Sequence, residues 1–138
     1  MTYSNLRRGP GGRPTAQAYS NIGLQTQVLS ATPEELISLL LDGARVAVIK
    51  AKIHLENGQI AERGEAISKA INIVESGLKS AINHEKGGEV ATHLNQSYDL
   101  IVYHLMQANL NADAKRLTIA ENMLSTLLES WQQATKKA

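Results

Sequence analysis

Residues 32–57 constrain the fold most, because they open with a helix-start signal and then carry apolar residues around most of a helix. Thr32 can cap free backbone N–H groups, Pro33 suits the first helical position, and Glu35 can complete a capping box. Three apolar stripes follow at helical spacing: Leu36, Leu40, Ala44, Ala47 and Ala51; Ile37, Leu41, Val48 and Leu55; and Leu39, Val46 and Ile53. A helix that rests one face on a core needs only one stripe, so we predict that this helix is central and that the other segments pack around it.

The remaining sequence predicts an all-α protein, an antiparallel up-down four-helix bundle with an N-terminal arm. No proline follows Pro33, and Ala, Leu, Ile and Glu are frequent. The predicted helices cover residues 32–57, 59–83, 89–110 and 112–133, with breaks at Asn57-Gly58 and Gly87-Gly88 and with Asn111 as the cap of the last helix. Because the links are short, successive helices should be antiparallel neighbours.

Residues 1–15 differ from the rest of the chain, since they combine Gly, Pro and Arg with few apolar groups. We predict a disordered basic tail there and a helical domain over residues 16–135. Residues 18–30 are too apolar for a free tail, but Gly23 interrupts a long helix, so we expect an arm that lies against the bundle. No apolar run suits a signal peptide or a membrane span, which predicts a cytoplasmic protein without direct membrane insertion.

The net positive charge of the chain comes from residues at its two ends. Setting aside the five positive charges at the ends changes the formal net charge from +1 to −4; they are Arg7, Arg8, Arg13, Lys136 and Lys137. An acidic body argues against a nucleic-acid-binding face, which needs clustered Lys and Arg. The absence of cysteine excludes a disulfide scaffold and cysteine-based metal or redox chemistry.

The histidines do not form a recognised catalytic or metal-binding motif. His54, His84, His93 and His104 include no Glu-x-x-His pair and no His-Glu-x-x-His motif, so we predict no metal, no cofactor and no catalytic residue. One alternative is a histidine phosphotransfer-type signalling bundle that accepts phosphate on His93 or His104. Their helix carries no positive charge nearby, which weakens that alternative. A bundle that weakly associates with itself is a third interpretation.

A surplus of apolar residues is the most informative feature of the later helices. Besides the inward stripes, these helices carry Ala66, Ala70, Ile73, Val102, Met106, Ile119, Met123 and Leu128. Small residues beside Ile, Val and Met suggest grooves between helices that receive an apolar helix from a partner. We therefore predict that glutamate at Ile73 or Val102 weakens partner binding more than it lowers stability.

Several runs of the sequence resemble the FliS family of flagellin export chaperones. They are AYSNIGLQTQVLSATPEELISLLLDGA (residues 18–44), SKAINIVESGL (68–78), GGEVATHLNQSYDLIVYHLMQAN (87–109) and the closing Trp131. The order and spacing of these runs carry the resemblance. The family has an aromatic residue just before the Asp-Gly pair, where this chain has Leu41.

The resemblance implies a small helical bundle without enzymatic activity. Such a protein binds the C-terminal segment of flagellin in apolar grooves, prevents premature polymerisation, and helps to present flagellin to the membrane export gate of the flagellar type III apparatus. That segment is disordered before assembly, so binding must bury enough apolar surface to offset its ordering. The resemblance also makes Tyr19, Ile22 and Leu24 part of an arm that the client displaces.

Overall fold

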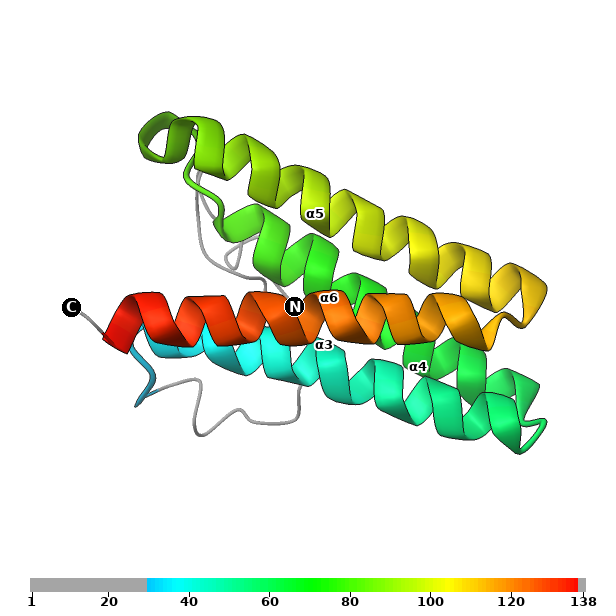
Figure 1. Ribbon diagram of the computed structural model, residues 1–138. Helices are drawn as coiled ribbons and strands as arrows, with labels where there is room; N and C mark the ends of the chain where they lie inside the picture. Colours follow the sequence, from blue (N-terminus) through cyan, green and yellow to red (C-terminus); the bar gives the residue numbers. More distant parts are fainter. Residues whose placement is uncertain (1–29, 137–138) are drawn as a thin grey trace, which may run out of the picture.

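The structure, a computed structural model, describes residues 30–136 as a bundle of four antiparallel helices (Figure 1). The predicted tail and most of the predicted arm, with Tyr19, Ile22 and Leu24, lie outside the described residues. The elements are α3 (Pro33–Glu56), α4 (Ile60–Asn72), the π-helix η2 (Ile73–Leu78), the 3-10 helix η3 (Lys79–Ala81), α5 (His84–Asn111) and α6 (Ala114–Lys136). The described residues contain no strand, and the predicted all-α bundle is confirmed.

The first turn of α3 forms the predicted capping box. The backbone N–H of Glu35 donates to Thr32 Oγ1 over 3.1 Å, and the backbone N–H of Thr32 donates to Glu35 Oε1 over 2.8 Å. Pro33 occupies the first helical turn, where no intrahelical partner is lost. Local sequence therefore fixes where α3 begins.

The central position of α3 is visible in its contacts, which are most extensive with α4 on one side and α6 on the other. Its buried residues are Leu40, Leu41, Ala44, Ala47, Val48 and Ala51. The third predicted stripe is less covered, since Leu39 and Val46 are only partly buried and Ile53 is half exposed. The helix is thus enclosed on two sides and not all around.

Helix α5 completes the bundle by packing on α6 and, less extensively, on α4 (Figure 1). Polar contacts tie neighbouring helices together. Lys52 Nζ of α3 lies 2.8 Å from Glu121 Oε1 of α6, and Arg63 Nη2 of α4 donates to the backbone oxygen of Asn109 in α5 over 3.1 Å.

The predicted second helix, residues 59–83, is α-helical only as far as Asn72. The chain continues as the π-helix, in which Ile73, Val74, Gly77 and Leu78 are all buried, and then as one 3-10 turn to Ala81. The hydrophobic pattern identified a helical segment there, but not the change in its winding.

The predicted break at Gly87-Gly88 lies inside α5 as a kink, and the last helix begins two residues after the predicted start. Helix α5 begins before Gly87-Gly88, since Asn83 Oδ1 accepts a hydrogen bond from the N–H of Lys86 over 3.0 Å. Gly88, with φ of 53°, then kinks this helix. Helix α6 begins after Asp113, whose Oδ1 accepts from the N–H of Lys115 over 3.0 Å. Asn111 is the last residue of α5 and does not cap α6.

Alanine substitutions at two glycines should change the stability of the protein in opposite directions. Gly64 lies inside α4, where an added Cβ would meet only the Asn109 amide at 3.9 Å, whereas Gly58 has a φ of +69°. Gly64→Ala should raise the free energy of unfolding by about 0.5 to 1 kcal/mol, because glycine is a poor helix former. Gly58→Ala should lower it by about 1 kcal/mol, because left-handed geometry strains any other residue. Urea unfolding measures both, and a destabilising Gly64→Ala would contradict the described α4–α5 packing.

Candidate functional site

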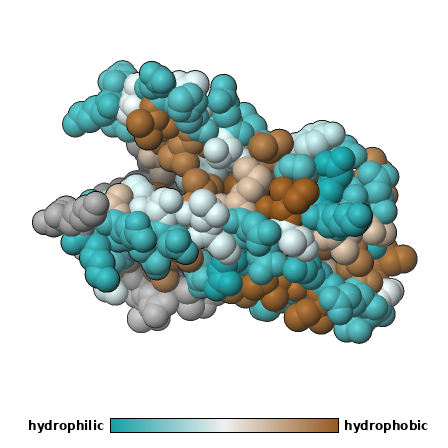
Figure 2. Space-filling view, in the orientation of Figure 1, coloured by the Kyte–Doolittle hydropathy of each residue, from teal (hydrophilic) through white to brown (hydrophobic). Residues whose placement is uncertain are grey.

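An apolar groove opens at the end of the bundle where α5 and α6 diverge (Figure 1). Its volume is about 600 Å³. The lining residues are Ile37 and Leu41 from α3; Leu78, Ala81, Ile82 and Asn83 from η2 to the start of α5; Lys86, Gly87, Val90, Ala91, Leu94 and Tyr98 from α5; and Leu127, Ser130, Trp131 and Ala134 from α6. Figure 2 shows hydrophobic side chains in this hollow and farther along the line between α5 and α6.

The groove exposes apolar surface that the bundle does not cover. Val90, on the α5 wall, is 73% exposed, and Leu94, Leu127 and Trp131 are only partly buried. Contiguous exposed apolar surface is typical of sites that bind another chain. The size and lining therefore suit the apolar face of a helix better than a small polar ligand.

Trp131 is held in place as a wall of the groove. Its Nε1 donates a hydrogen bond to the backbone oxygen of Glu34 over 2.9 Å, which links α6 to the start of α3. The indole is therefore oriented before any partner arrives. Because it is the only tryptophan in the chain, its fluorescence reports on the groove.

Tyr98 lies at the base of the groove and is only 3% exposed. Burial raises the pKa of Tyr98 to about 12, because the phenolate is poorly solvated there. The hydroxyl has no hydrogen-bond partner among the residues that the structure describes. The hydroxyl oxygen itself is not among the fully buried atoms that lack a partner, so it reaches the open side of the groove and is available to a bound molecule.

Three residues predicted to bind the partner lie in the core. Ala70, Ile73 and Val102 are buried, because α4 and η2 lie between α3 and α5 and pack against both. A partner would reach them only after helices separate. Glutamate at Ile73 or Val102 should therefore unfold the protein, and these substitutions do not separate binding from stability.

Three other predicted residues continue the apolar surface beyond the groove along the bundle. Ile119 and Met123 precede Leu127 at spacings of four, so the three lie along one side of α6. Ile119 is 41% exposed and Met123 is half-buried. Met106 on α5 is also exposed, at 58%. Together they continue the apolar surface away from the open end of the groove.

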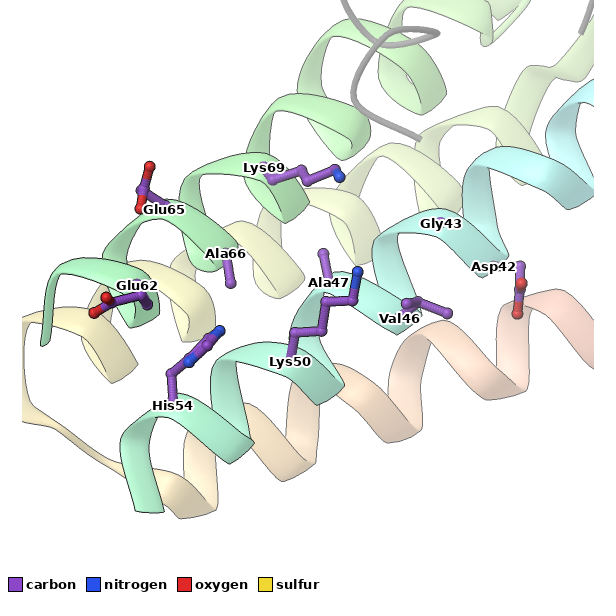
Figure 3. Close-up of a pocket in the computed structure, with 10 residues that line it drawn as sticks. All are labelled: Asp42, Gly43, Val46, Ala47, Lys50, His54, Glu62, Glu65, Ala66 and Lys69. Atoms are coloured by element: carbon purple, nitrogen blue, oxygen red, sulfur yellow. The ribbon is translucent and has the colours of Figure 1, made fainter. Parts of the chain in front are cut away.

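Ala66 lies in a second groove, between α3 and α4, with a volume of about 460 Å³ (Figure 3). Figure 3 shows Ala66 and Ala47 facing each other across this groove. The other lining residues include Asp42, Lys50, His54, Glu62, Glu65 and Lys69. Mixed charges make it a poor match for an apolar helix. Leu128, the last predicted residue, is half-buried beside Leu39 at the seam between α3 and α6.

The sequence assigned Val90, Leu94 and Trp131 to inward stripes and did not identify them as groove walls. The neighbouring Gly87-Gly88 pair is the signal that pointed there, because a kink at Gly88 redirects the first turn of α5. Periodicity shows which face of a helix is apolar, but not where the facing helix diverges.

The histidines do not form a site with one another. His104 Nδ1 lies 3.2 Å from Arg116 Nη1, and the pKa of His104 is lowered by burial and by this cation. Arg116 also stacks on Tyr103, 5.4 Å from the ring centroid. His93 is exposed. Within residues 30–136, no group of three or more His, Asp or Glu is arranged to hold a metal ion.

The fold and the groove define a small helical bundle with an open apolar groove at one end. Its sequence identifies the family: the chain belongs to the FliS family, because the model of flagellar protein FliS matches residues 15–138. This is a family of chaperones and not of enzymes. None of the described helices is both long enough and apolar enough to span a membrane.

Relatives from several bacteria cover nearly the same length. The flagellar secretion chaperone FliS of Salmonella typhimurium is 44% identical over 122 residues, which cover 88% of this chain and 90% of the relative. The FliS of Escherichia coli is 31% identical over 118 residues, 86% of this chain and 87% of the relative. The FliSB of Pseudomonas aeruginosa is 34% identical over 113 residues, 82% of this chain and 89% of the relative.

The buried Tyr98 predicts a loss of stability at high pH. Between the ordinary pKa of 10.0 and the folded value of about 12, the unfolded chain releases the phenolic proton while the folded chain keeps it. Stability from this group is therefore complete below pH 10 and falls by about 1.4 kcal/mol per pH unit above it. Urea unfolding from pH 9 to 11.5 should show this fall in the wild type and in the control Tyr103→Phe, but not in Tyr98→Phe. An equal fall in the stability of Tyr98→Phe would contradict the assignment of this pH dependence to Tyr98.

Proposed function

We propose that this chain is a cytoplasmic chaperone of flagellar type III export that binds the disordered C-terminal segment of flagellin. Membership of the FliS family supports a flagellar export role. The observation that carries the rest is the open apolar groove between α5 and α6. A folded client has already buried most of its apolar residues, whereas a disordered segment can fold into such a groove.

Binding proceeds by coupled folding of the client. The apolar face of a short client helix fills the groove and covers Val90 and Leu94, which releases water from both surfaces. The client then continues past Met123 and Ile119 towards Met106, where unbranched methionines adapt to its side chains. Affinity is distributed over a long path, because ordering the segment has a large entropic cost.

Covering the segment explains how the chaperone prevents premature polymerisation. While its apolar face lies in the groove, the flagellin segment is not available to other flagellin molecules. The complex then presents the client to the membrane export gate. Tyr19, Ile22 and Leu24 remain our proposal for the arm that the client displaces. Arg116 lies beside His104 and is a positive charge that the sequence did not predict, but membership of a chaperone family favours the export role over the phosphotransfer alternative.

Calorimetry with a synthetic peptide of the flagellin C-terminal segment tests the proposal. We expect a 1:1 complex, a negative heat-capacity change and a change in Trp131 fluorescence, because apolar surface is buried beside this indole. No binding at micromolar concentrations would contradict the proposed function. Light scattering of the free protein measures the predicted weak self-association separately.

Val90 and Ile60 provide a matched test of where the client binds. Both are exposed β-branched residues, 73% and 69% respectively, but only Val90 lines the groove. Val90→Glu should weaken peptide binding by at least about tenfold, because a carboxylate is costly to bury in an apolar groove. Ile60→Glu should change the Kd by less than about twofold, and both variants should keep the melting temperature of the wild type because both sites are exposed. Equal affinity of the two variants would place the client elsewhere.

A further inference from the structure

Few polar groups line the groove, and only some of them have a hydrogen-bond or ion-pair partner among the described residues. Asn83 Oδ1 already accepts a hydrogen bond from the N–H of Lys86, so it caps α5. Lys86 is the only charged side chain among the described residues that line the groove, and its ammonium group forms no ion pair within residues 30–136. A positive charge on an apolar rim favours a partner that brings a negative charge to the same place.

The Tyr98 hydroxyl is a second group without a partner. Tyr98 is only 3% exposed, and the described residues offer its hydroxyl no hydrogen bond. The hydroxyl oxygen is not among the fully buried atoms without a partner, so it faces the open groove. An occupant of the groove can therefore supply an acceptor for it.

The two groups are separated along α5 within the groove. Lys86 lies in the first turn of α5, and Tyr98 follows it on the same helix after about three turns, with Val90, Ala91 and Leu94 between them. An apolar surface alone would allow a bound helix to slide or to reverse. Two different polar groups at separate places along it distinguish one register and one direction from the others.

We propose that Tyr98 and Lys86 determine the register and direction of the client helix in this groove. The client chemistry that fits is an amphipathic helix of about three turns. Its groove face is apolar, with a hydrogen-bond acceptor opposite the Tyr98 hydroxyl and a carboxylate at the other end, opposite Lys86. This inference rests on the proposed function and adds the polar features that the client must carry.

Tyr98→Phe tests the hydroxyl by separating binding from stability. Because the hydroxyl has no partner in the free protein, its removal should leave the melting temperature at neutral pH unchanged or slightly raised. Its removal should nevertheless raise the Kd for the flagellin C-terminal peptide by about three- to tenfold, since a hydrogen bond made only in the complex is lost. A purely structural tyrosine would give the reverse pattern, a lower melting temperature with unchanged affinity.

Lys86→Met tests the charge while keeping a long apolar stem. Its Kd should rise by about two- to fivefold at low salt, and the difference should fade near 0.5 M salt because the ions screen the pair. Lys115→Met, an exposed lysine at the start of α6 and outside the groove, is the matched control and should bind as the wild type does. One carboxylate of the peptide, when replaced by its amide, should reproduce the effect of Lys86→Met and add nothing to it.

The outcomes separate the inference from the function on which it rests. If the wild type binds the peptide and both Tyr98→Phe and Lys86→Met bind it equally well, the inference is overturned and the proposed function stands. If the wild type does not bind the peptide, the proposed function is overturned and the inference fails with it. Weaker binding by both variants, with stability retained, supports both.

Discussion

The packing of α4 and α6 against the small residues of α3 is the interaction on which the rest of the structure depends. Ala44, Ala47 and Ala51 are buried at these contacts and allow the neighbouring helices to approach closely. Because α4 and α6 occupy the two sides of α3, α5 packs mainly on α6 and α4. The core is therefore built around one helix, and α5 is the least enclosed member of the bundle.

The groove is a consequence of this arrangement. Helix α5 diverges from α6 towards its N-terminal end, where Gly88 kinks it (Figure 1). Ile37 and Leu41 of α3 line the groove that results. Exposed apolar side chains such as Val90 contribute little to the stability of the free protein. The same surface becomes favourable when another chain covers it, which is why a binding protein retains it.

Polar contacts are distributed unequally between the two ends of the bundle. At the closed end, Arg63 bonds to Asn109 and Arg116 lies against His104, so α5 is fastened to both neighbours. In the described residues, no side-chain hydrogen bond or ion pair joins residues 84–94 of α5 to α6. The open end is held by apolar contacts alone on that side, and such contacts adjust more readily to different partner side chains than directional bonds do.

The sequence by itself determined the all-α class, the number of long helices, the central role of α3 and its capped start at Thr32. These features could be predicted because they depend on residues that are neighbours along the chain. The family resemblance and the surplus of apolar residues also predicted a binding surface between helices. Tertiary structure alone decided which residues line the open groove, since Ala70, Ile73 and Val102 became core while Val90, Leu94 and Trp131 became groove walls. A periodic pattern defines the apolar face of each helix about its own axis, but where two helices diverge depends on packing between residues far apart in the sequence.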